Sequence, residues 1–297
     1  MSRSIPMIPH DSSRFNPYTG LQLTFEDLDR LSARPIYFNY FDIKIYVIGC
    51  GGTGSFLVPH LARIANWLAL SGKTIDLTLV DFDSVEQHNL LRQNFCRAEL
   101  GMNKAQSLAI RYKAMYPNLR IGVIEGGVGT INFETNRPVV VIGCVDNPHA
   151  RDKITQLFTE RNGWGCSPCW WIDCGNGFNF GQVAIGNSSS LDLEDYVLEP
   201  ATCITLPLPS IQYPDLLNSN QEQEANLSCA EQNDLNGQSL IINSHMAVVA
   251  GEMVSQLLNS RLRRFQVEVD TLRGSVKSKW ITQHNIDQII KSARENI

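Results

Sequence analysis

A glycine cluster at 49–54 is the first segment whose residue types and spacing indicate chemistry. Its letters, GCGGTG, fit the pattern G-x-G-x-x-G. Gly49 allows a tight turn, Gly51 and the adjoining Gly52 let a phosphate approach the backbone, and Gly54 permits close helix packing. Free N–H groups at the start of the following helix would face the anion. The pattern favours a nucleotide-phosphate site over a sharp strand–helix turn that binds nothing.

Two carboxylates further along the chain would complete such a site. Asp81 ends a β-rich run, where it can accept hydrogen bonds from ribose hydroxyls of a dinucleotide or a triphosphate. Asp146 follows a continuous apolar run, and the carboxyl ends of such strands converge on the ligand crevice. A carboxylate there suits Mg²⁺, which binds through one or two carboxylates and substrate phosphates. The sequence therefore predicts a magnesium site at Asp146.

Two cations separate the candidate nucleotide classes. Arg92 lies in the polar segment 83–95, and Lys104 stands at the start of a later helix. A dinucleotide site needs no such pair. A triphosphate does, because Arg binds phosphate with a fork and Lys adds a point charge. Either cation alone would be ordinary surface charge. Together with the glycine loop they favour ATP, and an NAD(P)-binding oxidoreductase stays the alternative.

These residues need a scaffold of alternating strands and helices to bring them together. The β-rich runs fall at 43–48, 75–80, 120–125, 138–142, 170–174, 180–185 and 265–271, and helical spacings fall at 56–68, 104–115, 148–159 and 240–258. The alternation in the first half predicts an α/β, doubly wound, Rossmann-like and mostly parallel sheet. A Gly/Asn turn at 175–179 indicates that antiparallel strands are added in the C-terminal half.

Composition sets the class of protein. The chain has 297 residues, of which 43% are hydrophobic and 19% charged, as in globular proteins. Residues 1–40 have no sustained period and form an N-terminal arm, and residues 41–297 form one domain with an aperiodic stretch at about 187–237. The formal charge of −5 disfavours nucleic acid as a partner. We expect no membrane span and a cytoplasmic location with reduced thiols, since neither a signal peptide nor a long apolar run is recognisable.

Four segments of the chain resemble the ThiF/MoeB/ubiquitin-activating (E1-like) family of adenylating enzymes. They are GCGGTGS at 49–55, VDFDSVEQHNLLRQNF at 80–95, GMNKA at 101–105 and CVDN at 144–147. The resemblance covers about residues 41–186. A later segment, LSCAEQ followed by SLIIN, is similar to the bacterial ThiF-like proteins of the plasmid-borne PRTRC system.

The resemblance implies an enzyme that uses ATP and Mg²⁺ to adenylate the C-terminal carboxylate of a ubiquitin-like or sulfur-carrier-like small protein. It implies a homodimer, and a ThiF-like adenylating domain over 41–297 with a crossover loop at about 187–237. In such a site the four glycines shape the phosphate loop, Asp81 takes the ribose and Lys104 steadies the α-phosphate. The other residues placed at the nucleotide are Asp83, Asn89, Arg92, Gln93, Asp146 and Asn147. A ThiF-like dehydratase and a non-catalytic scaffold are alternatives within the same resemblance.

Two of the 8 cysteines are candidates for a later thioester step. Cys203 lies in ATCITLP, similar to the Cys–Thr followed by Pro in eukaryotic activating enzymes. Cys229 lies in LSCAE, which matches the crossover-loop cysteine of ThiF and MoeB, and we favour it. The alternative for both is a small buried apolar residue.

Zinc would be a competing use of cysteine. Cys166 and Cys169 have the C-x₂-C spacing, and a structural zinc site usually takes four nitrogen or sulfur ligands from two such pairs. No cysteine follows Cys229, so the second pair expected from the resemblance is missing. We therefore expect a turn with two unmetallated thiols, with zinc as the alternative.

Overall fold

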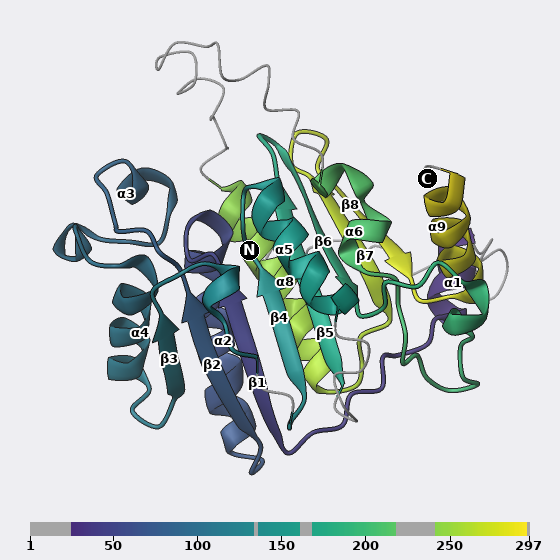
Figure 1. Cartoon of the computed structure of the whole chain (residues 1–297), viewed down its shortest axis with the longest axis horizontal. Coiled ribbons are helices and arrows are strands. Elements are labelled where there is room, and N and C mark those ends of the chain that lie inside the picture. Colours follow the sequence, from purple (N-terminus) through teal and green to yellow (C-terminus); the bar gives the residue numbers. More distant parts are fainter. Residues whose placement is uncertain (1–24, 134–135, 161–167, 218–240, 296–297) are drawn as a thin grey trace, which may run out of the picture.

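The fold is one layered α/β unit, shown in Figure 1 as a computed structural model that describes residues 25–133, 136–160, 168–217 and 241–295. Its strands form one eight-stranded sheet in the order β3-β2-β1-β4-β5-β6-β7-β8. Helices cover both faces of the sheet. The predicted Rossmann-like fold, with antiparallel strands in the C-terminal half, is confirmed.

The first part of the sheet is parallel. Its strands are β1 (Asp42–Ile48), β2 (Thr74–Val80), β3 (Arg120–Ile124), β4 (Val139–Gly143) and β5 (Cys169–Asn176). The chain begins in the middle at β1, runs outward to β3 and returns to β4 on the other side of β1. Ligands of open α/β sheets bind at such a reversal, beyond the carboxyl ends of the strands. The topology therefore brings the segments after β1, β2 and β4 to one place.

The second part of the sheet is antiparallel and extends it beyond β5. Its strands are β6 (Phe180–Gly186), β7 (Arg264–Asp270) and β8 (Ser275–Trp280). β8 and helix α9 (Gln283–Glu295) were not predicted from the sequence. β8 is an edge strand of mostly polar residues whose side chains are largely half-buried or exposed, so it lacks a clear apolar alternation.

Apolar side chains form a core on each face of the sheet, because successive residues of a strand point to opposite sides. The larger core lies under α2 (Gly52–Ala69), α4 (Lys104–Met115) and α8 (Ile242–Leu258). The smaller core lies under α5 (Pro148–Glu160) and the short α6 (Pro209–Gln212). In β5, Trp170 enters the larger core and Trp171 the smaller one, where it stacks on Phe158. Both tryptophans are fully buried.

The remaining short elements lie around this frame. They are helices α1 (Phe25–Ser32) and α3 (Asn89–Arg92) and the 3-10 helices η1 (Arg97–Glu99), η2 (Val128–Thr130), η3 (Leu193–Tyr196) and η4 (Pro214–Leu217). None of the helices in the described residues is long and apolar enough to cross a membrane.

The described part of the N-terminal arm is packed rather than loose. Ile36 and Phe38 are buried, and Ile36 forms a β-bridge with Cys203. Asn285 of α9 donates a hydrogen bond from its Nδ2 to the Asp29 carboxylate in α1 (3.0 Å). Ile36 and Phe38 alternate with the exposed Tyr37, and the lack of a sustained period in the sequence of the arm did not predict their burial.

Candidate active site

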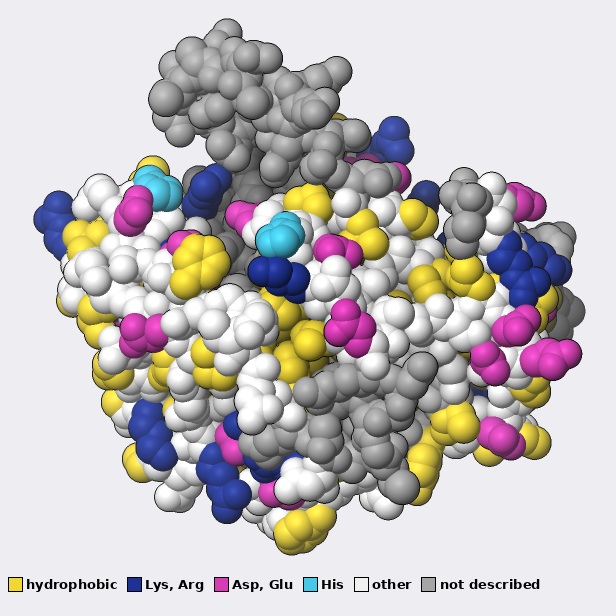
Figure 2. All heavy atoms as spheres, viewed as in Figure 1, with side chains coloured by type: hydrophobic (Ala, Val, Ile, Leu, Met, Phe, Trp, Pro, Cys, Tyr) yellow, Lys and Arg dark blue, Asp and Glu magenta, His cyan; other side chains and the backbone are white. Residues whose placement is uncertain are grey.

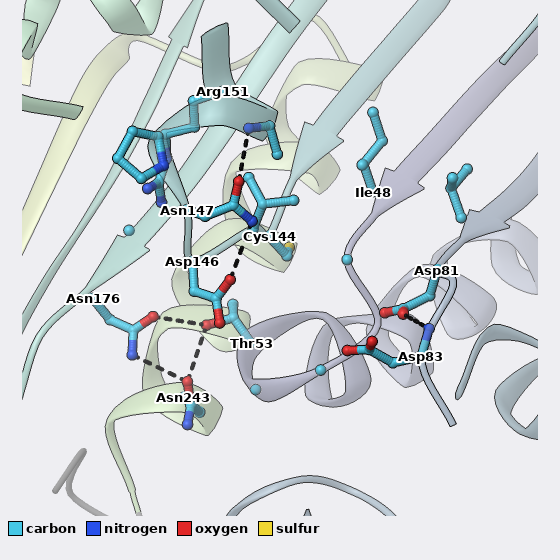
Figure 3. A pocket seen from close by; sticks show the side chains of 18 of the residues that line it. Ile48, Thr53, Asp81, Asp83, Cys144, Asp146, Asn147, Arg151, Asn176 and Asn243 are labelled. Carbon is cyan, nitrogen blue, oxygen red and sulfur yellow. Dashed lines mark hydrogen bonds between the residues drawn. The ribbon is translucent and has the colours of Figure 1, made fainter. Parts of the chain in front are cut away.

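A pocket of about 690 Å³ lies at the carboxyl ends of the parallel strands, at the upper edge of the sheet in Figure 1. In Figure 2 side chains of both charges gather along this edge, and Figure 3 shows the pocket from close by. The predicted nucleotide residues that line it are Gly49, Gly51, Gly52, Asp81, Asp83, Arg92, Gln93, Lys104, Asp146 and Asn147.

Two glycines of the loop are required by the packing of the protein itself. Gly49 has a φ of +89°, and a Cβ there would lie 2.6 Å from the carbonyl oxygen of Cys144. Gly54 does not line the pocket, and a Cβ there would lie 1.9 Å from the carbonyl oxygen of Gly49. Gly54 thus lets helix α2 lie directly on the turn, as the sequence analysis expected.

Gly51 differs from its neighbours because no protein atom fills the place of its side chain. The nearest atom to a Cβ built there is Gln93 Nε2 at 3.5 Å. At Gly52, in contrast, a Cβ would lie 2.6 Å from Asn243 Oδ1. Gly51 stands directly before helix α2, and the first N–H groups of a helix have no acceptor within the helix itself. The open backbone at Gly51 therefore suits a phosphate group.

Asp81 is buried and ties the glycine loop to the end of β2. Its Oδ2 accepts the backbone N–H of Cys50 (2.6 Å), and its Oδ1 accepts that of Asp83 (2.8 Å). Burial raises the pKa of the Asp81 carboxyl, and these two N–H groups act in the opposite direction. Each carboxylate oxygen keeps a further lone pair that can accept from a ribose hydroxyl. Asp81 therefore shapes the loop in addition to its predicted contact with ribose.

Lys104 is held at the pocket by Asp83. Lys104 Nζ donates to Asp83 Oδ2 at 2.8 Å, and its side chain is 8% exposed against 49% for Asp83. The position follows from the start of α4, where the Asn103 side chain accepts the N–H of Gln106 (3.0 Å). The same Asn103 donates from Nδ2 to the carbonyl oxygen of Asp81 (3.0 Å). One asparagine thus fixes the helix start against the end of β2.

The segment after β2 contributes Arg92 and Gln93 to the pocket. Asn89, which was predicted beside them, is buried, and its Oδ1 accepts the backbone N–H of Glu86 (2.8 Å). Asn89 does not line the pocket. Asn89 shapes the loop that carries Arg92, and its contact with the triphosphate stays a prediction.

Asp146 and Asn147 follow β4 and precede helix α5. Asn147 Oδ1 accepts the N–H of Ala150 (2.8 Å), which caps the helix, and its Nδ2 lies 3.5 Å from Asp146 Oδ1 (Figure 3). Asp146 is exposed at the pocket. Among the described residues no group of three or more His, Cys, Asp or Glu could hold a metal ion by itself. A single open carboxylate fits Mg²⁺ that keeps water and phosphate ligands.

Two buried charges that the sequence analysis missed lie beneath the pocket. Arg151 of α5 donates from Nε to Asp173 Oδ2 of β5 at 3.1 Å, and their side chains are 8% and 0% exposed. Burial raises the pKa of Asp173, and Arg151 acts in the opposite direction. Arg151 lines the pocket. The place of Arg151 near the start of the helix that follows Asp146 could have indicated Arg151, but no local pattern indicates Asp173 as its partner.

A cluster of uncharged polar side chains was also missed. Thr53 Oγ1 lies 3.4 Å from Asn176 Oδ1 and 3.4 Å from Asn243 Oδ1, and Asn176 Nδ2 donates to Asn243 Oδ1 at 3.1 Å (Figure 3). The three residues come from α2, the end of β5 and α8, and all line the pocket. The rule that strand ends face the ligand would have selected Asn176, as it selected Asp146.

Cys203 lies outside the pocket. It is fully buried, its Sγ–H donates to the carbonyl oxygen of Thr205 (3.3 Å), and burial raises its pKa to about 12. A nucleophilic cysteine needs an accessible thiolate. In this conformation Cys203 has the properties of the buried apolar residue that was its alternative.

Of the other three cysteines considered in the sequence, the described residues include one. Cys169 begins β5 and is buried in the smaller core. Cys166, its predicted partner in a zinc site, and Cys229, the favoured nucleophile, lie outside the described residues. Zinc at Cys166 and Cys169 and a thioester at Cys229 stay predictions.

The arrangement suits a ligand with several negative charges at one end. Arg92, Lys104 and the N–H groups of the glycine loop can neutralise phosphates, and Asp81 stands where a ribose would lie. Asp146 opens toward the same space and suits a divalent cation. The residues present therefore fit a magnesium-bound nucleoside triphosphate.

Comparison with known proteins gives a family for the first half of the chain. Residues 37–164 match the model of the ThiF family. Ubiquitin-like modifier-activating enzyme 5 of Drosophila ananassae is 30% identical over 161 residues, which are 50% of this chain and 38% of that protein. The enzyme of the same name from Branchiostoma floridae is 29% identical over 160 residues, 49% of this chain and 36% of that protein. The chain thus spans well under half the length of these relatives.

Solved structures are similar over a longer part of the chain. PaaA gives a TM-score of 0.52 at 17% identity, covering 80% of this chain and 73% of PaaA. E. coli MccB, solved with AMPCPP and MccA, gives a TM-score of 0.54 at 13% identity, covering 80% of this chain and 63% of MccB. At these identities the similarity shows the fold. The finer resemblance to PRTRC proteins stays a prediction.

Proposed function

The chain belongs to the ThiF/E1-like superfamily of adenylating enzymes, and from this premise we propose that it adenylates the C-terminal carboxylate of a small protein or peptide, with ATP as the second substrate. The acceptor we favour is a ubiquitin-like or sulfur-carrier-like protein. The names of two similar proteins support this choice, since one is a ubiquitin-like modifier-activating enzyme and the other, MccB, was solved with MccA.

One observation carries the proposal: a single pocket collects the glycine loop, Arg92, Lys104 and Asp146 from four separate segments. A hydride-transfer site would need the glycine loop and Asp81 but neither of the two cations. A triphosphate needs all of them, because its charge must be neutralised while the α-phosphorus is attacked.

The reaction follows from the positions of the charges. A carboxylate oxygen of the acceptor attacks the α-phosphorus of ATP and forms a new P–O bond. The bond from the α-phosphorus to the bridging oxygen of the β-phosphate breaks, and pyrophosphate leaves. Lys104, which Asp83 holds in place, neutralises charge at the α-phosphate, and Arg92 binds the leaving phosphates. The protein supplies positioning and charge.

Asp146, with the phosphates, would hold Mg²⁺ in this site. When bound, the ion would neutralise charge on the phosphates of the leaving pyrophosphate. Asn147 caps the N-terminal end of α5. The carboxylate of the preceding residue, Asp146, lines the pocket.

Pyrophosphate exchange tests the proposal. We expect ATP–pyrophosphate exchange that depends on a small ubiquitin-like or sulfur-carrier-like protein with a free C-terminal carboxylate. Asp146→Ala should lower the exchange rate at least about 100-fold, since a metal position contributes several kcal/mol of charge stabilisation. The variant should fold normally because Asp146 is exposed. Tight NAD binding without exchange would instead support the oxidoreductase alternative. ATP hydrolysis coupled to dehydration of a non-protein carboxylate would support the dehydratase alternative.

We extend the proposal to a thioester step on Cys229, because Cys203 is buried and its thiol has a raised pKa. The acyl carbon would then pass from the adenylate to the Cys229 sulfur, with release of AMP. A conjugate that DTT cleaves should form in the wild-type protein and in Cys203→Ser, and it should be missing in Cys229→Ser. A conjugate in both variants would exclude both cysteines as the nucleophile.

A homodimer belongs to the same proposal and rests on the family resemblance. Light scattering of the purified chain should give twice the mass of one chain. A monomer at the concentration that supports exchange would remove this part and leave the adenylation proposal intact.

A further inference from the structure

The pocket is longer than the predicted nucleotide residues require. Its lining extends from Gly126, just beyond β3, to Gln182 on β6. The strand order separates β3 from β6 by five steps, or about 24 Å at the usual spacing between neighbouring strands. The nucleotide residues come from the β2, β1 and β4 side. The half beyond β4, which we call the distal half, is lined by Arg151, Gly175, Asn176, Gly177, Phe180, Gln182, Asp215 and Leu216.

Gln182 carries an unsatisfied group into this distal half. In the register of β5 and β6 it lies opposite Gly175, so both residues face the same side of the sheet. The Gln182 amide lies against Gly175, where a Cβ would come within 2.3 Å of Nε2. Gln182 Oε1 is buried and accepts no hydrogen bond from the described residues. A buried acceptor without a donor is costly, so a ligand N–H at this place would be favoured.

The chemistry around Gln182 disfavours a second phosphate. Among the described residues of the distal half the one cation, Arg151, already donates to the Asp173 carboxylate. Asp215 adds a negative charge to the same lining. The remaining lining groups include the amide of Asn176 and the ring of Phe180. Such a surface accepts an uncharged chain that offers N–H and C=O groups, which describes a peptide backbone.

We propose that Gln182 is a specificity-determining residue that binds a backbone peptide group of the acceptor's C-terminal tail. Its Oε1 accepts a tail N–H while Nε2 is available to a tail carbonyl oxygen, since a primary amide has the same donor and acceptor as a peptide group. The proposal rests on the proposed function and narrows it to peptide acceptors.

The position of Gln182 also indicates which part of the tail it reads. β6 lies two strands from β4, or about 10 Å. An extended chain covers that distance with about three residues. The carboxylate would then reach the space beside Asp146 while a peptide group a few residues earlier lies at Gln182.

An amide-to-ester scan tests the proposal. The probes are N-acetyl-tetraglycine and the series in which each amide N–H in turn is replaced by an ester oxygen, at millimolar concentration in ATP–pyrophosphate exchange. In the wild-type protein one ester should raise the KM for the peptide about tenfold or more, because the buried acceptor loses its donor. In Gln182→Met the amide peptide should show this higher KM, and the same ester should cause no further loss. The KM for ATP should stay unchanged.

Gln266→Met is the matched control, since Gln266 is also a buried glutamine with an unsatisfied Oε1 but does not line the pocket. It should leave the peptide KM and the ester pattern as in the wild type. Equal KM values for all esters, or an ester penalty that persists in Gln182→Met, would overturn the role of Gln182 and leave adenylation standing. Exchange with an intact small protein but with no peptide would also overturn it. No exchange with any acceptor would instead contradict the proposed function.

Discussion

Lys104 is in place before any ligand binds, because Asp83 holds its ammonium group at 2.8 Å. A lysine that is 92% shielded from water is costly unless it is paired, and the half-exposed Asp83 carboxylate supplies that pair. Asp81 is likewise held in place by the protein, since its two oxygens accept the N–H groups of Cys50 and Asp83. The site is therefore organised by hydrogen bonds that the ligand does not have to create.

Lys104→Met should weaken binding of ATP–Mg²⁺ about tenfold to a hundredfold, because a charged hydrogen bond to phosphate is lost. Asp83 stays half in contact with water, so the fold should be retained. Lys113→Met, on the same helix, is the matched control: Lys113 donates to the carbonyl oxygen of Leu119 (2.7 Å), away from the pocket. Titration calorimetry of both variants measures the difference. Equal affinities would contradict a role for Lys104 at the phosphates.

At the scale of elements, the glycines at the junction of β1 and α2 have two roles. Gly49 and Gly54 are required by packing, and Gly51 faces the ligand site. The sequence could predict this junction, since the spacing G-x-G-x-x-G and the flanking strand and helix are local features. It could not predict Asn243, which lies 190 residues after Thr53 and meets it only after α8 packs beside α2. For the same reason the Arg151–Asp173 pair could not be found: neither residue stands in a local pattern that names its partner.

Gly54→Ala should mainly lower the stability of the fold, whereas Gly51→Ala should mainly lower the affinity for ATP. A Cβ at Gly54 would overlap the carbonyl oxygen of Gly49 at 1.9 Å, so this variant should lose about 3 kcal/mol of unfolding free energy. At Gly51 the nearest atom would be at 3.5 Å, so that variant should lose less unfolding free energy than Gly54→Ala. Gly51→Ala should nevertheless bind ATP less tightly. Urea unfolding and ATP titration of each variant test this, and tight ATP binding by Gly51→Ala would contradict a phosphate at this loop.

The segment that carries Arg92 is anchored by an ion pair between η1 and α4. Burial alone would raise the pKa of Glu99, but the hydrogen bonds from Arg111 and from the Cys96 N–H (2.7 Å) lower it to about 2. A carboxyl whose pKa is lowered on folding stabilises the protein above its ordinary pKa of 4.5, and this contribution is lost as the pH falls through about 2.

Glu99→Gln should therefore lose about 1–3 kcal/mol of unfolding free energy at pH 7. The difference from the wild type should shrink as the pH is lowered from 4.5 toward 2. Urea unfolding across this range measures it. A difference that does not change with pH would show that the charge of Glu99 contributes nothing.

At the scale of the whole molecule, the pocket joins two parts of the chain. The nucleotide half belongs to residues 37–164, which match the ThiF family, and most of the distal half comes from β5, β6 and η4, beyond that match. The parallel part of the sheet and the nucleotide half follow from sequence because buried parallel strands and their carboxyl-end residues leave strong local patterns. In the distal half the sequence predicts the antiparallel strands but not the side chains that line the pocket, since the short 3-10 helix η4 is brought beside α5 by tertiary packing.

The central claim is that a carboxylate of the acceptor attacks the α-phosphorus of ATP. Its most direct test uses the acceptor that supports pyrophosphate exchange, with its C-terminal carboxylate labelled with oxygen-18. Hydroxylamine is added to cleave the product at the acyl carbon, and AMP is analysed by mass spectrometry. The account predicts pyrophosphate and AMP that carries one labelled oxygen from the carboxylate. Unlabelled AMP, or ADP and phosphate as the products, would contradict it.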